Sequence, residues 1–236
     1  MIGEREMKID TKPIEIASKE GRDFLLEHEA LKIFESVGIT FPENALVKDT
    51  KEALAFAKKV GYPVVIKAMS PQILHKSDYK AVVVGINDNG ELKEKFEDMK
   101  KRLSKYNLVG ILIEKQVKKG TELIIGMNID PTFGPVVAFG IGGVLVEAIS
   151  DVTFRLCPTT KHRALRMINE IKTQKMLNGF RGLPPVDRDA VAYMIVKVSE
   201  LAIELEDYIK EIDLNPIIAN EDGVFGVDAR IILKKK

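Results

Sequence analysis

The sequence predicts an α/β protein whose two parts differ in texture. Between Phe24 and Glu114, helical patterns of apolar residues alternate with short β-branched runs, which favours a small α/β subdomain. From Thr121 onward, strand patterns come first, two helical stretches follow, and a hairpin ends the chain. We therefore expect an α/β (α+β) fold of three consecutive segments: a polar, irregular arm at 1–20, a small subdomain at 21–115 and a large subdomain at 116–236.

The elements of the first part follow from apolar spacing and from helix-ending residues. A helical stripe over 24–37 ends at a glycine, and Thr50 is expected to cap a second helix over 51–60, which stops at Gly61-Tyr-Pro63. A polar loop at 70–80 joins two strand patterns. The remaining predicted elements are strands at 64–68, 81–85 and 109–114 and a charged helix at 91–106.

The second part shows no internal repeat, and its elements are separated by glycine and proline. Arg181-Gly-Leu-Pro-Pro185 divides its two helical stretches. The predicted strands lie at 122–127 and 135–139, the helices at 161–176 and 187–206, and the two arms of the hairpin at 211–218 and 224–231.

Composition and charge narrow the possible classes of protein. The 236 residues are 45% hydrophobic and 30% charged, as in globular proteins. A net charge of +1 gives no electrostatic basis for a nucleic-acid partner, and no apolar run approaches the ~20 residues that cross a bilayer. Charges from Glu4 onward are not expected in a signal peptide. The single cysteine, Cys157, suits a reducing cytosol and is expected to be an inert buried thiol, so we expect a cytoplasmic protein.

The C-terminal hairpin carries oxygen ligands that suit a metal ion. Asp213 and Asn215 are two residues apart, so in a strand both side chains leave the same face. Asp228 follows after the turn Asn220-Glu-Asp-Gly223, on the expected partner strand. Carboxylate and amide oxygens are ligands that Mg²⁺ accepts, often together with nucleotide phosphates.

Two cations are candidates for contacts with phosphate. Lys67 lies inside the strand pattern Val-Val-Ile-Lys-Ala, either as an edge-strand lysine that blocks aggregation or as an ammonium that faces a phosphate. Arg155 can bind phosphate through its guanidinium fork, although an arginine at a strand end can equally form a surface pair. The residues alone leave both alternatives open.

The junction of the two parts could bind a nucleoside. Glu114-Lys-Gln-Val117 is a hinge whose backbone groups could meet an adenine edge, with Lys115 near the purine and Glu122 accepting from ribose hydroxyls. A solvated connector is the simpler interpretation. Gly142 and Gly143 could let backbone N–H groups approach phosphates, although a tight structural turn explains the same pattern.

His75 lies in the polar loop after Lys67. Most loop histidines are simply exposed, yet an imidazole can act as a nucleophile near neutral pH. Lys76 or Ser77 could then steady a phosphoryl group. Three histidines and one cysteine give no zinc-binding spacing.

Together these motifs resemble the ATP-grasp fold over roughly residues 24–232, in which two subdomains hold a nucleotide between them. More narrowly, the chain resembles the β subunits of ADP-forming acetyl-CoA synthetases, which are related to succinyl-CoA synthetases. The motifs that carry the resemblance are Gly61-Tyr-Pro-Val-Val-Ile-Lys-Ala, Ser70-Pro-Gln-Ile-Leu-His-Lys-Ser-Asp, Gly140-Ile-Gly-Gly-Val and Asp213-Leu-Asn-Pro. The last of these has Asp where the succinate enzymes have Glu.

The resemblance implies a reversible reaction in which acyl-CoA, phosphate and ADP give the acid, CoA and ATP. A separate CoA-binding α subunit, phosphorylated on a histidine, is the implied partner, in an α2β2 heterotetramer. The resemblance assigns Asn215 and Asp228 to Mg²⁺, Lys67 and Arg155 to the phosphates of ADP or ATP, His75 to a second phosphoryl carrier, and Asp213 to the incoming phosphohistidine.

Two alternatives lead to different expectations. A stand-alone ATP-grasp ligase that forms an acyl phosphate would be active without a CoA-binding partner. A non-catalytic nucleotide-binding subunit would bind ADP without transferring a phosphoryl group. The sequence fixes neither the acyl group nor a preference for ADP over GDP.

Overall fold

The computed structural model describes residues 9–143 and 151–235, and its contacts divide the chain into two compact units. The small unit consists of Leu26–His28 and Phe41–Val117. The large unit consists of Met1–Leu25, Glu29–Thr40 and Lys118–Lys236. The boundary therefore differs from the predicted one at residue 21, because most of the first long helix belongs to the large unit.

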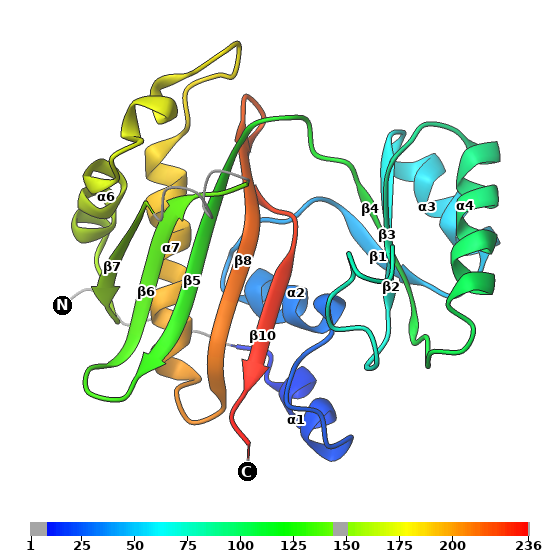
Figure 1. Cartoon of the computed structure of the whole chain (residues 1–236), viewed down its shortest axis with the longest axis horizontal. Coiled ribbons are helices and arrows are strands. Elements are labelled where there is room, and N and C mark those ends of the chain that lie inside the picture. Colours follow the sequence, from blue (N-terminus) through cyan, green and yellow to red (C-terminus); the bar gives the residue numbers. More distant parts are fainter. Residues whose placement is uncertain (1–8, 144–150, 236) are drawn as a thin grey trace. The chain divides into compact units, whose positions relative to one another are not determined.

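The small unit is a four-stranded antiparallel sheet with two helices (Figure 1). Its strand order is β1-β4-β2-β3, so β2 is an interior strand. The helices pack through small and aromatic residues such as Ala53, Ala57 and Phe96, all fully buried. The elements are β1 (Asn44–Val47), α3 (Thr50–Val60), β2 (Val64–Met69), β3 (Val82–Ile86), α4 (Asn89–Arg102) and β4 (Gly110–Lys115).

Aspartates cap both helices of the small unit. The Asp49 side chain accepts a hydrogen bond from the N–H of Glu52 at 2.8 Å, and Asp88 does the same for Glu91 at 2.9 Å. Thr50 was the predicted cap of α3, and this prediction is wrong by one residue. Asp and Thr are both good N-caps, but only Asp49 has the extended backbone that a cap requires just before the helix.

The large unit is a six-stranded antiparallel sheet with helices on one face (Figure 1). The strand order is β10-β8-β5-β6-β7, and β9 also pairs with β8. Helix α7 packs on β5 and β6, and α6 packs on β7. The elements are α1 (Lys12–Lys19), α2 (Glu27–Ser36), β5 (Thr121–Asp130), β6 (Gly134–Ile141), β7 (Val152–Leu156), α6 (Lys161–Glu170), the 3₁₀ helix η1 (Gln174–Asn178), α7 (Arg188–Glu204), β8 (Ile209–Asn220), β9 (Gly223–Gly226) and β10 (Ala229–Leu233).

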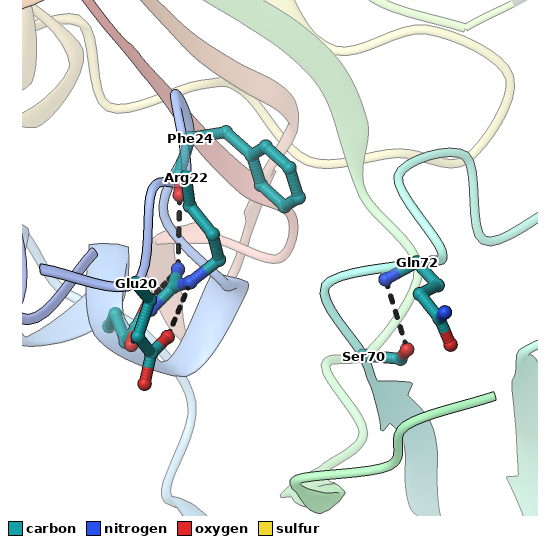
Figure 2. A network of polar contacts seen from close by, with 6 residues as sticks. Glu20, Arg22, Phe24, Ser70 and Gln72 are labelled. Carbon is teal, nitrogen blue, oxygen red and sulfur yellow. Dashed lines mark hydrogen bonds and ion pairs between the residues drawn. The ribbon is translucent and has the colours of Figure 1, made fainter. Parts of the chain in front are cut away.

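The N-terminal segment is more regular than predicted. The arm at 1–20 contains α1, an amphipathic helix that buries Pro13, Ile14 and Ala17. After α1, Arg22 donates from Nε to Glu20 at 2.7 Å and from Nη1 to the carbonyl of Phe24 at 3.0 Å (Figure 2). These bonds hold the chain as it turns from α1 toward β10 and α2.

The helix predicted at 161–176 ends at Glu170 for an electrostatic reason. The buried carboxylate of Asp151 accepts the backbone N–H groups of Lys172 at 2.8 Å and Thr173 at 2.7 Å. Burial by itself would raise the pKa of Asp151, but the hydrogen bonds from Thr173 and the two N–H groups outweigh it and lower the pKa. This contact turns the chain before η1 begins.

Candidate functional site

The polar residues of β8 share one face of the large sheet. Ile212 and Leu214 point to the core, whereas Asp213 and Asn215 lie on the opposite face of the large sheet, which we call the open face. This confirms the predicted alternation. The backbone N–H of Asn215 donates to the carbonyl of Asp228 at 3.2 Å. The structure therefore brings the two predicted metal ligands side by side.

The partner of β8 is divided where Asp228 lies. Strand β9 pairs with the end of β8, β10 pairs with its beginning, and Asp228 occupies the bend between them. Asp228 was predicted to lie within a continuous partner strand, and the bend corrects this detail. Opposite it, β8 shifts register against β5 between Ile217 and Leu214. Both strands are thus irregular at the position of the candidate ligands.

Arg230 joins this group from β10. Its Nη2 lies 2.6 Å from Glu211 and 3.6 Å from Asp213, and its buried Nε has no hydrogen-bond partner among the described residues. Burial raises the pKa of Asp213, Arg230 opposes this shift, and the nearby carboxylates of Glu211 and Asp228 add to it. Two carboxylates, Glu211 and Asp213, therefore meet one guanidinium, and the carboxylate of Asp228 lies close enough to act on Asp213.

In the small unit, Lys67 belongs to a buried cluster of charges. Its Nζ lies 2.7 Å from Glu27 Oε1 and 2.9 Å from Glu114 Oε1. Lys76 Nζ lies 2.8 Å from the other oxygen of Glu27. Since β2 is an interior strand, Lys67 does not protect a sheet edge, and that interpretation is wrong. The charge of Lys67 is balanced by the carboxylates of Glu27 and Glu114, which are distant from it in the sequence.

The predicted hinge is built into the small unit. The carboxylate of Glu114 is buried against Lys67, and Lys115 Nζ donates to the carbonyls of Gly61 at 3.2 Å and Tyr62 at 2.7 Å. Val117 is half-buried at the end of this segment. The side chains of Glu114 and Lys115 are thus committed to protein contacts, and backbone groups remain the candidates for binding an adenine edge.

Glu122 and the glycine loop do meet within the large unit. The N–H of Gly142 donates to the carbonyl of Glu122 at 2.7 Å. A Cβ on Gly143 would lie 2.5 Å from Glu122 Oε2, and its φ of +75° also favours glycine. Glu122, Gly142 and Gly143 line one side of a cavity of about 230 Å³, opposite Met176 and Phe180. Gly143 is therefore favoured by its positive φ and by the nearby carboxylate, whereas Gly142 is required by the close approach of the Glu122–Leu123 backbone.

His75 lies exposed in the loop between β2 and β3. Ser70 Oγ accepts the N–H of Gln72 at 3.1 Å at the start of this loop (Figure 2). At its end, Arg102 donates to the carbonyls of Tyr79 at 2.6 Å and Lys80 at 3.0 Å. The loop is thus fixed at both ends while the imidazole reaches solvent.

Arg155 is not brought to the open face. It lies opposite Val137, whose side chain points to the helices, and its Nη2 lies 2.5 Å from Glu170 of α6. The structure therefore shows the surface pair that the sequence left as the alternative.

In the same segment, burial raises the pKa of Cys157 to about 12, so the thiol stays protonated at neutral pH.

Comparison with known proteins assigns this arrangement to a family. A family model described as an ATP-grasp domain matches residues 16–233. The β subunit of ADP-forming acetate–CoA ligase II from Pyrococcus furiosus is 46% identical over 229 residues, covering 94% of this chain and 97% of that protein. The β subunit of ligase I from the same organism is 47% identical, covering 93% and 96%. The chain belongs to the ATP-grasp β subunits of ADP-forming acetate–CoA ligases.

Solved structures of an acetyl-coenzyme A synthetase from Candidatus Korarchaeum cryptofilum support the same family. A complex with coenzyme A and Ca-AMPCP matches with a TM-score of 0.90 and 40% identity, covering 95% of this chain and 100% of that chain. A second structure, with coenzyme A and Mg-AMPPCP, matches with a TM-score of 0.84 and 39% identity, covering 95% and 99%. Its phosphohistidine segment points towards the nucleotide binding site.

Two residues that contact predicted site residues, Arg230 and Glu27, were not singled out from the sequence. Arg230 follows Asp228 by two positions, so strand alternation could have placed it on the same face. Glu27 gave no such signal, because it lies 40 residues before Lys67 and opens a helix. Only the folded chain brings this carboxylate to β2.

The donors on the open face fit an Mg²⁺ ion that is coordinated by protein and substrate together, rather than one enclosed by protein ligands alone. Within residues 9–143 and 151–235, no group of three or more His, Cys, Asp or Glu side chains could hold a metal ion. Asn215 and Asp228 supply two hard oxygen donors, and Mg²⁺ commonly takes one or two such side chains together with substrate phosphates and water. Nor does the described part of the chain hold any helix long and apolar enough to cross a membrane.

Proposed function

We propose that this chain is the nucleotide-binding β subunit of an ADP-forming acyl-CoA synthetase and makes ATP by passing a phosphoryl group from phosphohistidine to ADP. The observation that carries the proposal is the pairing of Asn215 with Asp228 on the open face of the large sheet. Membership of this ligase family supports assigning these two oxygen donors to a metal–phosphate complex. Acetyl-CoA is the substrate suggested by the Pyrococcus furiosus relatives.

Different residues would bind the metal ion, the phosphates and the nucleoside. Asn215 and Asp228 would hold Mg²⁺, which spreads the charge of the phosphates during transfer. Lys67 would contact phosphate oxygens, and Glu122 with the backbone of Glu114–Val117 would contact the nucleoside. Gly142 and Gly143 would let backbone N–H groups approach the phosphates. Arg155 is the weakest of the predicted phosphate contacts, because Glu170 already holds it.

His75 would carry the phosphoryl group between two sites. Its exposed imidazole accepts the group from the phosphohistidine of the α subunit, and the P–N bond to His75 then breaks as a P–O bond forms to the terminal phosphate of ADP. Asp213 would hold the imidazole ring of an arriving phosphohistidine by accepting its N–H, a role that its half-buried position on β8 supports. The phosphohistidine segment of the Korarchaeum structures supports a segment of this kind.

The implied partner is a CoA-binding α subunit. The β-subunit relatives support such a partner, and we propose an α2β2 heterotetramer that works in the cytoplasm. The acid and the CoA would then be bound mainly by α.

The test uses the full chain, its α partner, acyl-CoA, phosphate, ADP and Mg²⁺. We expect acid-labile phosphate on His75, and we expect His75→Ala to abolish ATP formation while His162→Ala, at an exposed position of α6, leaves it unchanged. Full ATP synthesis by His75→Ala would exclude the relay and leave direct transfer from α to ADP. Activity without any α subunit would instead support a stand-alone ligase. Nucleotide binding without any phosphoryl transfer would support a non-catalytic subunit.

A further inference from the structure

The residue next to His75 is drawn back to the body of the small unit. Only 17% of the Lys76 side chain is exposed, although both neighbouring residues, His75 and Ser77, are exposed. Its ammonium lies 2.8 Å from Glu27 Oε2, as an ion pair without hydrogen-bond geometry. A lysine in a solvent-facing loop normally keeps its charge in water, so this placement has to be stabilised by the carboxylate.

Glu27 is suited to this role because both of its oxygens are used. Oε1 binds Lys67 on β2 at 2.7 Å, Oε2 meets Lys76, and only 2% of the side chain is exposed. Glu114 completes the cluster, so two carboxylates balance two ammoniums away from water. A buried charge that loses its partner is strongly destabilised, and each member therefore fixes the positions of the others.

The contacts of the loop show what this cluster adds. Ile73 is buried in the hydrophobic core of the small unit, and the Tyr79 ring packs edge-on against Tyr106 at 5.2 Å. Arg102 binds the carbonyls at the end of the loop. The carbonyls of His75 and Lys76 also accept backbone hydrogen bonds from Asp78 at 3.3 Å and Ala81 at 2.8 Å. Of the side-chain tethers, Lys76 is the one adjacent to His75.

We propose that Glu27 is a positioning residue for phosphoryl transfer. Through Lys76 it holds the His75 segment, residues 70–80, at a fixed position relative to Lys67. The inference rests on the proposed relay through His75. Glu27 touches neither the phosphoryl group nor the nucleotide in this scheme. It acts by fixing the lysine next to the carrier and the lysine on β2 at the same carboxylate. Misplacing a reacting group by about 1 Å can cost about 10²-fold in rate.

The test compares Lys76→Met, Lys76→Arg and Glu27→Gln in the full chain with its α partner. Rapid-quench measurement should show His75 phosphorylation slowed about tenfold to 10²-fold in Lys76→Met and Glu27→Gln. Lys76→Arg keeps the charge and should recover most of the rate. In Lys76→Met the KM for ADP should stay near the wild-type value while kcat falls, because the nucleotide is bound elsewhere. The double variant should be no slower than Glu27→Gln alone, since Glu27→Gln already removes the ion pair that Lys76→Met breaks.

A second measurement separates this inference from the relay itself. Amide hydrogen exchange over residues 70–80 in the unphosphorylated chain should be faster in Lys76→Met and Glu27→Gln, and unchanged in Lys59→Met, which breaks an exposed pair with Glu43 in the same unit. If wild-type protein never carries phosphate on His75, the relay fails, and the exchange data still decide whether Glu27 holds the segment. Normal exchange and normal phosphorylation in Lys76→Met would overturn the inference even if Glu27→Gln failed to fold.

Discussion

The two units carry their charges in opposite ways. In the small unit, Lys67 and Lys76 are buried with Glu27 and Glu114, so every charge of this cluster has an opposite charge within 3 Å. On the open face of the large unit, Arg230 contacts Glu211 and Asp213, and the carboxylate of Asp228 acts on Asp213. Asp213 is half-buried and Asn215 is exposed. One region is electrostatically complete, and the other has an excess of negative charge.

Under the proposed function, each unit would contribute to binding an anionic ligand in its own way. A lysine held by buried carboxylates is fixed in place before any phosphate arrives, and its geometry depends on the folding of the small unit. The open face instead supplies oxygen donors whose excess negative charge favours a cation between protein and phosphate. We therefore expect changes in the first region to reduce stability as well as phosphoryl transfer, and changes in the second region to appear mainly in catalysis.

The largest effect on stability is expected for Lys67→Met. The substitution leaves Glu27 and Glu114 buried beside each other without the ammonium between them, and breaking a buried pair in this way costs about 3–5 kcal/mol. Urea unfolding of wild type and variant measures the loss. Lys59→Met is the control, and equal stability of the two variants would mean that the buried cluster is no more important than a surface pair.

The next effect is expected for Asp228→Asn, and it should be catalytic. The variant keeps an oxygen donor at the bend but removes the charge that binds Mg²⁺, so phosphoryl transfer should fall about 10²–10³-fold. Raising the Mg²⁺ concentration should recover part of the rate, as measured by ATP formation at a series of Mg²⁺ concentrations. The free energy of unfolding should change little. A rate that is unchanged at low Mg²⁺ would remove Asp228 from the metal site.

The sequence predicted those features that strand periodicity and motif order determine. The shared face of Asp213 and Asn215 followed from a spacing of two, and the family followed from four motifs in order. Features made by contacts between distant segments could not be seen in it. Glu27 meets Lys67 across 40 residues, and Glu114 was taken for a hinge residue because its buried partner was not visible.

Local competition between similar residues explains the other differences. Asp49 and Thr50 are both capable N-caps, and backbone conformation selects the aspartate. The helix predicted at 161–176 is interrupted because Asp151, ten residues before it, binds the N–H groups that would continue it. The position of Arg155 near a strand end left its face undetermined, and the sheet register, which pairs it with Val137, places it on the helix side.

Arg230 and Arg155 give a smaller and more direct test of the open face. Arg230→Met removes the guanidinium beside Asp213 and should lower kcat about tenfold or more, because charge developing on the phosphoryl group loses a donor. Arg155→Met should leave the rate near wild type, since its partner Glu170 lies on the helix side. Steady-state kinetics of both variants decide between them, and the reverse order of effects would return Arg155 to the phosphate site.

The smallest effect is expected for Asp213→Asn, and its sign depends on pH. Burial raises the pKa of Asp213 in the folded chain, so between the ordinary carboxyl pKa, about 4, and the raised one, the folded state binds more protons than the unfolded state. The free energy of unfolding therefore falls as pH rises through that window, and the cost of the charged carboxylate is fully present above the raised pKa. Asp213→Asn should then be slightly more stable than wild type above the raised pKa, and this gain should shrink as pH falls below it. Thermal unfolding at several pH values measures it, with Asp222→Asn at an exposed turn as the control. A variant that is less stable above the raised pKa would show that Arg230 stabilises the carboxylate more than burial and its acidic neighbours destabilise it.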